Sequence, residues 1–135
     1  KKKFNKESIF SKLWMTEKNI KDLVSEGHII GLHSYYHPTC IEKKSYLKQK
    51  SEYTKNLEHL ESLIGKNKIY SMAHPCGSYN EDTLKILNDL DIKIGFKSNM
   101  KKIKPKNSLE IPRQDHTVVL NLLKGGHNIL GQYFG

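Results

Sequence analysis

Two histidines separated by three residues, His33 and His37, are the sharpest chemical feature of the sequence. Imidazoles four positions apart can aim at one point if the segment between them turns like a helix. Zn²⁺ accepts neutral imidazole nitrogen at about 2.0–2.1 Å, and a catalytic zinc keeps about three protein ligands plus a water. The spacing therefore makes His33 and His37 candidate metal ligands. Two surface histidines beside a turn, ended by Pro38, remain the alternative interpretation.

A second segment that can carry chemistry is His74-Pro75-Cys76-Gly77, where Pro and Gly indicate a loop. An apolar run precedes this loop, and Asn80 can cap a helix that follows it. Such a loop can present backbone N–H groups to an oxyanion as it develops, although a plain strand-to-helix turn explains the same residues equally well. Cys76 as a nucleophile or metal ligand is the weaker interpretation, because no basic residue adjoins it in the sequence.

The elements that must position these residues are helices alternating with short apolar strands. Capping residues and apolar stripes predict helices over residues 17–26, 42–64, 81–90 and 117–124. Short apolar runs predict strands over residues 28–33, 69–73, 92–96 and 109–111, the first of them fully buried. Because strands that alternate with helices pair in parallel through right-handed crossovers, the sequence predicts an α/β fold.

Parallel strands of this kind predict where a site should form. Functional residues in such folds lie at the carboxyl ends of the strands, on the loops that lead into the helices. The loops after Leu32, Ala73 and Ile111 should therefore face one another. They carry the two paired histidines, the segment 74–77 and the segment 113–116.

The composition limits the classes of protein that the sequence can encode. Its 135 residues suit one domain over residues 1–135. No apolar run exceeds three residues, which excludes a membrane-spanning helix of about 20 residues. The net charge of +9 could attract nucleic acid, but no RNA-recognition or zinc-finger pattern accompanies it, so nucleic acid is not the expected partner. No secretory signal is visible, which leaves a cytoplasmic and an envelope-associated location open.

Residues 27–37, which read G-H-I-I-G-L-H-S-Y-Y-H, resemble the second motif of the polysaccharide deacetylases, the NodB-homology family. That motif reads G-H-E-I-G-x-H-[ST]-x-x-H, so Ile29 stands where Glu is usual. Residues 73–80 resemble the third motif in a branch that reads F-A-Y-P-Y-G-x-Y-N, and residues 109–113 are similar to its L-P-R segment. The resemblance covers about residues 13–124.

The resemblance implies a distorted (β/α) barrel, a divalent metal that is usually Zn²⁺, and hydrolysis of N-acetyl groups on the amino sugars of a carbohydrate substrate. It makes His33 and His37 metal ligands and Ser34 a brace for their loop. It makes the backbone N–H of Cys76 an oxyanion donor. It places four further residues near the substrate: His74, Pro75, Gly77 and Tyr79. Near the reacting groups it implies Arg113, which would orient a catalytic carboxylate. The late catalytic histidine of the family has His116 and His127 as its candidates. Tyr35, Tyr36 and Tyr79 offer rings that could stack on a sugar, with ordinary packing as the alternative.

The sequence also departs from the family. The first motif, T-F-D-D, supplies the catalytic base and the carboxylate ligand, yet the chain contains no Asp-Asp pair. We therefore expect a partial barrel that lacks its opening strands, and little or no activity from these residues alone. Exposed apolar edges of a partial barrel would favour homo-oligomers. The alternative is a non-catalytic relative that binds carbohydrate or protein through the same cleft.

Overall fold

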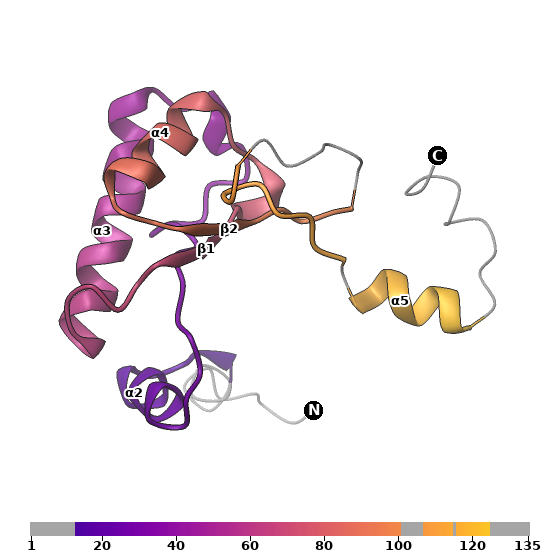
Figure 1. Ribbon diagram of the computed structural model, residues 1–135, viewed down its shortest axis with the longest axis horizontal. Helices are drawn as coiled ribbons and strands as arrows, with labels where there is room; N and C mark the ends of the chain where they lie inside the picture. Colours follow the sequence, from indigo (N-terminus) through magenta and orange to yellow (C-terminus); the bar gives the residue numbers. More distant parts are fainter. Residues whose placement is uncertain (1–12, 101–106, 115, 125–135) are drawn as a thin grey trace, which may run out of the picture.

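The computed structural model describes residues 13–100, 107–114 and 116–124. Its centre is a short parallel sheet in which β1 (Ser71–Ala73) pairs with β2 (Ile94–Phe96), with Met72 opposite Gly95. Single parallel bridges extend the sheet on both sides, from Leu32 to Met72 and from Phe96 to Ile111. Four chain segments thus run side by side in one direction (Figure 1), as in part of a (β/α) barrel.

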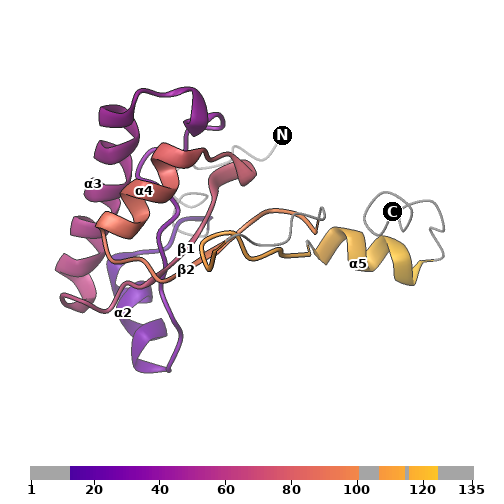
Figure 2. The same cartoon turned by 45° about the horizontal axis from the view of Figure 1, so that its top comes forward.

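Helices pack beside this sheet. α3 (Tyr46–Ile64) packs against both α4 (Glu81–Asp89) and α2 (Glu17–Ser25), and Figure 2 shows α3 and α4 lying together on one side of the strands. The predicted capping residues are confirmed, because Thr16 and Asn80 each form a capping box at the start of their helices. Gly65 ends α3 with a φ of 100°, a backbone conformation that costs glycine little.

The predicted strands are longer than the observed ones. In the segment 28–33 only Leu32 forms a bridge, and Ile29 is 64% exposed, so the expectation of a fully buried strand was wrong. The segment 109–111 likewise contributes only the bridge at Ile111. An apolar run fixes which residues can be buried, but the number that pair depends on how far a neighbouring segment runs alongside.

The predicted helix over 42–64 is divided in two. A 3₁₀ turn, η1 (Ile41–Lys43), comes first, and Lys44 is extended before Ser45 caps α3. The fully buried Gln49 accounts for this break, because its side-chain amide donates to the Lys44 carbonyl at 3.0 Å. Thr83 of α4 donates to the same amide group at 2.5 Å, which ties the starts of α3 and α4 together.

Two glycines allow the sheet segments to approach closely. A Cβ on Gly95 would lie 2.5 Å from the Leu109 carbonyl oxygen, and one on Gly31 would lie 2.9 Å from the Ser71 carbonyl oxygen. Both neighbours are backbone atoms, so neither can move aside as a flexible side chain would. The absence of a side chain at these positions therefore sets the spacing of the segments that carry the candidate site.

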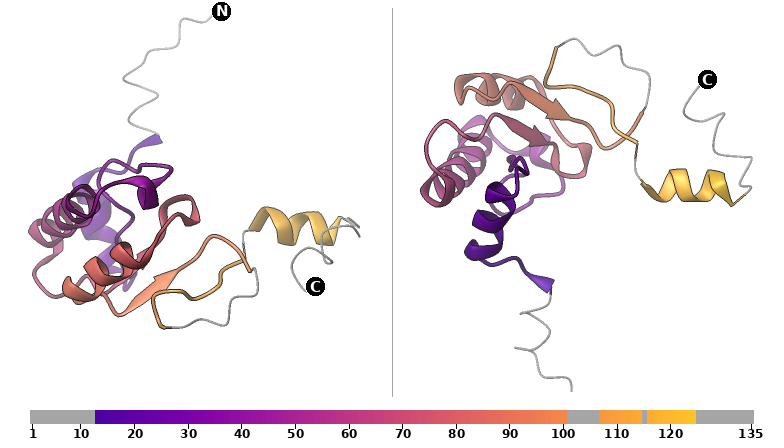
Figure 3. Two further views of the ribbon diagram at one scale, coloured as in Figure 1. Left: turned by 90° about the horizontal axis from the view of Figure 1, so that it is seen from above. Right: turned by 60° about the horizontal axis from the view of Figure 1, so that its bottom comes forward.

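The last described helix, α5 (His116–Leu123), lies apart from this body. It projects away from the sheet and from α3 and α4 in Figures 1 and 2 and in both views of Figure 3. Within the described ranges, no helix has the length and apolar character needed to cross a membrane.

Candidate functional site

The two candidate ligands are brought together at the end of the Leu32 segment. The imidazole ring centroids of His33 and His37 lie 4.8 Å apart with their planes at 57°. Positive φ angles of 60° at Ser34 and 52° at His37 fold the loop back on itself. The Ser34 hydroxyl stabilises this fold by accepting the His37 backbone N–H at 3.1 Å. A loop with two positive φ angles, and not the helical turn considered from the sequence, therefore brings the two rings together.

The His33 ring is oriented by the neighbouring strand. Its Nδ1 lies 2.8 Å from the Ala73 carbonyl oxygen, and because a carbonyl only accepts, Nδ1 carries the proton and donates. The lone pair of Nε2 is then available. Metal-binding histidines usually donate their second ring N–H to a carbonyl or carboxylate in this way, which fixes the tautomer.

Two side chains of α3 also hold the loop that carries His33 and His37. The Asn56 side-chain oxygen accepts the backbone N–H of His33 at 2.9 Å. One turn earlier, Glu52 Oε2 accepts the backbone N–H groups of Tyr35 at 3.1 Å and Tyr36 at 2.8 Å. Sequence reasoning missed Glu52 and Asn56, although their four-residue spacing places them on one face of a predicted helix.

The histidine pair fits a divalent metal as two of its ligands. The two rings are neighbours, and the neutral His33 ring with its proton on Nδ1 has an unprotonated Nε2 that can bind a cation. Among the residues that the structure describes, no group of three or more His, Cys, Asp or Glu side chains could hold a metal ion. A complete coordination shell therefore requires at least one further ligand.

The loop after β1 forms the second side of the site. It contains a 3₁₀ turn, η2 (Pro75–Gly77), in which Cys76 and Gly77 have φ angles of 53° and 68°. The Gly77 N–H donates to the His74 carbonyl oxygen at 3.0 Å. The Cys76 N–H makes no hydrogen bond to the described part of the chain, and Cys76 is exposed. This N–H is therefore free to bind an acceptor.

The side chains at either end of this loop anchor it to the segment before Ile111. His74 is 1% exposed, and its Nε2 donates to the Leu109 carbonyl oxygen at 2.8 Å. Tyr79 stacks on the His74 ring at 4.2 Å, and its hydroxyl donates to Glu110 Oε1 at 3.0 Å. Burial, followed by the hydrogen bond to Glu110, raises the pKa of Tyr79 to about 12. These contacts span more than thirty positions, so they hold the loop after β1 to a distant segment.

These positions bear on the residues expected near the substrate. The side chains of His74 and Pro75 are buried, whereas Gly77 and Tyr79 are half-buried. Substrate contact by the four remains a prediction, and the structure gives His74 and Tyr79 a positioning role.

The surroundings of His74 favour the neutral form of its imidazole. Burial lowers the pKa of its imidazole, and the nearby Lys97 and His33 act in the same direction against the Leu109 carbonyl and Glu110. Its Nδ1 has no hydrogen-bond partner within the described residues, and the same holds for Lys97 Nζ and Glu110 Oε2. A buried polar group without a hydrogen-bond partner lowers the stability of the fold. A change in the protonation of His74, Lys97 or Glu110 should therefore change the free energy of unfolding.

We expect His74 to make stability depend on pH. Unfolded His74 has the ordinary pKa of 6.5, and the folded value is lower. Its stabilising contribution is therefore fully present above the unfolded pKa and is lost as the pH falls through the window down to the folded pKa. Urea denaturation of wild type and His74→Gln at about pH 7.5 and about pH 5.5 checks this. The amide of Gln can still donate to Leu109, so the variant should lose less stability on acidification. An equal loss in both proteins would contradict the assignment.

The segment before the third predicted loop contacts the site, but the candidate residues of the loop itself do not join it. Leu109 and Glu110, which precede Ile111, contact the loop after β1. Arg113 is exposed, and His116 begins α5, which points away in both views of Figure 3. The structure therefore joins the loops after Leu32 and Ala73 and does not bring His116 to them. His127 lies outside the described residues.

The paired histidines and the loop that contains Cys76 lie at the carboxyl edge of a parallel sheet, where the sequence predicts the site. Residues 4–95 match the family described as polysaccharide deacetylase. The chain belongs to this family, which confirms the family resemblance, and the matched range contains the motifs at residues 27–37 and 73–80 but not the segment 109–113. No curated protein sequence matches the chain.

Three solved structures share the fold of this chain. The Streptococcus pyogenes deacetylase PplD, in complex with acetate, superposes with a TM-score of 0.67 at 24% identity, over 82% of this chain and 50% of that one. The BpsB deacetylase domain from Bordetella bronchiseptica gives 0.63 at 13% identity, over 75% and 48%. BA3943, a CE4 family pseudoenzyme from Bacillus anthracis, gives 0.52 at 25% identity, over 56% and 26%. The chain thus spans about half the length of PplD, and the partial (β/α) barrel with parallel strands is confirmed.

Proposed function

We propose that this chain contributes to a metal-dependent deacetylase that hydrolyses N-acetyl groups on the amino sugars of a polysaccharide or glycoconjugate. The observation that carries the proposal is the His33–His37 ring pair at 4.8 Å, with His33 Nδ1 held by Ala73. Family membership supports the reaction class. The chain itself supplies two imidazole ligands and a loop that can receive an oxyanion.

Each part of the site has a role in amide hydrolysis. A bound divalent cation, Zn²⁺ being the usual one for such a histidine pair, would supply an acidic water and polarise the acetyl oxygen. His33 and His37 would hold that cation, and the Ala73 carbonyl keeps the His33 tautomer correct. The Cys76 N–H can donate to the acetyl oxygen as negative charge develops there. Water oxygen bonds to the acetyl carbon, the C–N bond breaks, and the sugar amine leaves with a proton.

The base and the acid of this reaction are not provided by the described site. Proton transfer to and from the reacting groups needs a positioned side chain such as a carboxylate. The 135 residues contain no Asp-Asp pair, and Arg113, which could orient such a carboxylate, is exposed. We therefore expect the cation to bind while hydrolysis by these residues alone is slow or absent.

Two measurements on the 135-residue protein test the proposal together. Calorimetric titration with Zn²⁺ should show binding, and assay of acetate release from an N-acetylglucosamine oligomer should show little or none. Failure to bind Zn²⁺ would contradict the proposed metal site. Acetate release that disappears in His33→Ala would overturn the expected inactivity while supporting the reaction class.

A second candidate is a non-catalytic relative that binds carbohydrate or protein through the same cleft. The observation that favours it is the likeness to BA3943, which is a pseudoenzyme, together with the missing third ligand within the described ranges. This candidate predicts that glycan binding persists without Zn²⁺ and in the His33→Ala, His37→Ala double variant. The deacetylase proposal predicts that binding of the N-acetyl group weakens when both imidazoles are removed.

A further inference from the structure

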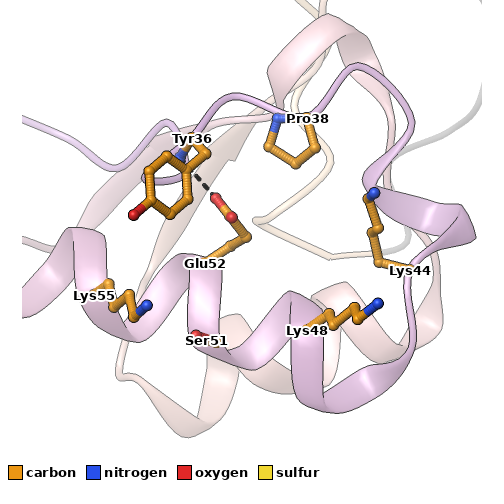
Figure 4. A pocket seen from close by; sticks show the side chains of 7 residues that line it. All are labelled: Tyr36, Pro38, Lys44, Lys48, Ser51, Glu52 and Lys55. Carbon is orange, nitrogen blue, oxygen red and sulfur yellow. Dashed lines mark hydrogen bonds between the residues drawn. The ribbon is translucent and has the colours of Figure 1, made fainter.

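A pocket of about 190 Å³ adjoins the histidine loop on the side of α3. Tyr36 and Pro38 form one wall, and side chains from η1–α3 form the other, as Figure 4 shows. Ligand pockets that enclose a whole drug-sized molecule have about 300–1,000 Å³. This pocket is smaller, so it suits one substituent of a larger ligand.

The lining of the pocket is strongly basic. Lys44, Lys48 and Lys55 contribute three ammonium groups, and Glu52 contributes the opposing carboxylate. Figure 4 shows Lys44 and Lys48 on one side, Tyr36 and Lys55 on the other, and Glu52 between them. None of the three lysines forms an ion pair with a carboxylate in the described part of the chain. The pocket therefore has positive charge that is available to a ligand.

Glu52 does not serve as the ion-pair partner of these lysines. Its Oε2 accepts the backbone N–H groups of Tyr35 and Tyr36, so the carboxylate holds the histidine loop against α3. Lys55 instead lies 5.9 Å from the centroid of the Tyr36 ring, a cation–π geometry that keeps its ammonium at the pocket. The α3 wall thus presents cations, and one of them lies close to the aromatic ring of Tyr36 on the loop wall.

The position of the pocket connects it to the candidate metal site. Tyr36 and Pro38 are the immediate neighbours of His37, and successive Cα atoms are about 3.8 Å apart. A sugar chain with its N-acetyl group at His33 and His37 can therefore place an adjacent substituent in the pocket. Tyr35 packs edge-on against Tyr36 at 4.8 Å, which adds aromatic surface alongside.

We propose that this pocket binds an anionic group, a carboxylate or a phosphate, carried by the sugar chain that the site deacetylates. The inference rests on the proposed function and narrows its substrate class to acidic glycans. Each exposed charge pair contributes only a few-fold to affinity, so three lysines together should favour an acidic ligand by about tenfold over a neutral one. The preference should fall as added salt screens the exposed charges.

The test compares three N-acetylated oligosaccharides of equal length: a neutral one, one with a uronate carboxylate, and one with a phosphodiester. Calorimetry measures their binding to wild type and to the variant Lys44→Gln, Lys48→Gln, Lys55→Gln. The matched control is Lys21→Gln, Lys50→Gln, Lys66→Gln, which removes the same charge from exposed positions outside the pocket. Far-ultraviolet circular dichroism verifies that all three proteins are folded.

We expect wild type and the control to bind at least one acidic oligosaccharide about tenfold more tightly than the neutral one, and the pocket variant to lose this preference. The acidic ligand that binds more tightly identifies the group as carboxylate or phosphate. No preference in wild type, or an equal loss in the control, would overturn the inference. Lysine-dependent binding of a short DNA duplex that exceeds binding of both acidic glycans would also overturn it. Zn²⁺ titration separates the two proposals. Failure of the wild type to bind Zn²⁺ would contradict the deacetylase proposal, whereas lysine-dependent glycan binding could still be measured. Normal Zn²⁺ binding by the pocket variant would show that its loss of glycan preference does not come from a damaged metal site.

Discussion

Replacing His33 with alanine should lower the affinity of the protein for Zn²⁺ by more than about 100-fold. Groups that only orient a metal ligand typically cost 10–100-fold in affinity when they are removed, so loss of a ligand should cost more. His37→Ala should have a comparable effect, because the two rings lie 4.8 Å apart and would share the ion. Calorimetric titration with Zn²⁺, checked by metal content after dialysis, measures both changes.

Two further variants sharpen this prediction. His28→Ala is the matched control, because His28 is also exposed and lies in the same segment but outside the ring pair. It should leave Zn²⁺ affinity unchanged. Asn56→Ala removes the acceptor of the His33 backbone N–H and should weaken binding by a smaller factor, about tenfold. Equal effects of His28→Ala and His33→Ala would show that Zn²⁺ binds somewhere other than the proposed pair.

Replacing Tyr53 with alanine should lower the free energy of unfolding by about 3–5 kcal/mol, the usual cost of removing a large aromatic side chain from a core. Tyr53 is 0% exposed and belongs to the cluster that joins α3 to the sheet and to α4. The same helix carries Glu52 and Asn56, which hold the histidine loop. A cavity at Tyr53 should therefore also loosen the candidate metal site. Urea denaturation followed by circular dichroism measures the change in stability.

Tyr53→Phe separates the ring from the hydroxyl. Burial raises the pKa of Tyr53, and its hydroxyl has no hydrogen-bond partner among the described residues. Because removal of an unpartnered buried polar atom leaves nothing unsatisfied, the variant should be as stable as wild type or more stable. A loss of stability in Tyr53→Phe as large as that in Tyr53→Ala would mean that the hydroxyl, and not the packed ring, stabilises this core.

Local features of the sequence predicted the elements well. Capping residues form bonds within one helical turn, which is why Thr16 and Asn80 locate the starts of α2 and α4. The apolar stripe predicted over residues 42–64 supplies Tyr53, Leu60 and Ile64 to the buried face of α3, because residues three, four or seven positions apart lie on the same side of a helix. Strand lengths were overestimated, because pairing needs a neighbouring segment, and at Leu32 that neighbour engages one residue.

The sequence by itself determined that the chain carries a histidine pair after one apolar segment and a Pro-Gly loop after the next, in the order of the polysaccharide deacetylases. Only the tertiary structure decided what orients them. Asn56 reaches the His33 backbone across 23 positions, and His74 reaches the Leu109 carbonyl across 35. Such contacts depend on the direction in which α3 packs and on the register of the sheet. Spacing within a segment cannot encode them, since many distant residues are equally able to donate or accept a hydrogen bond.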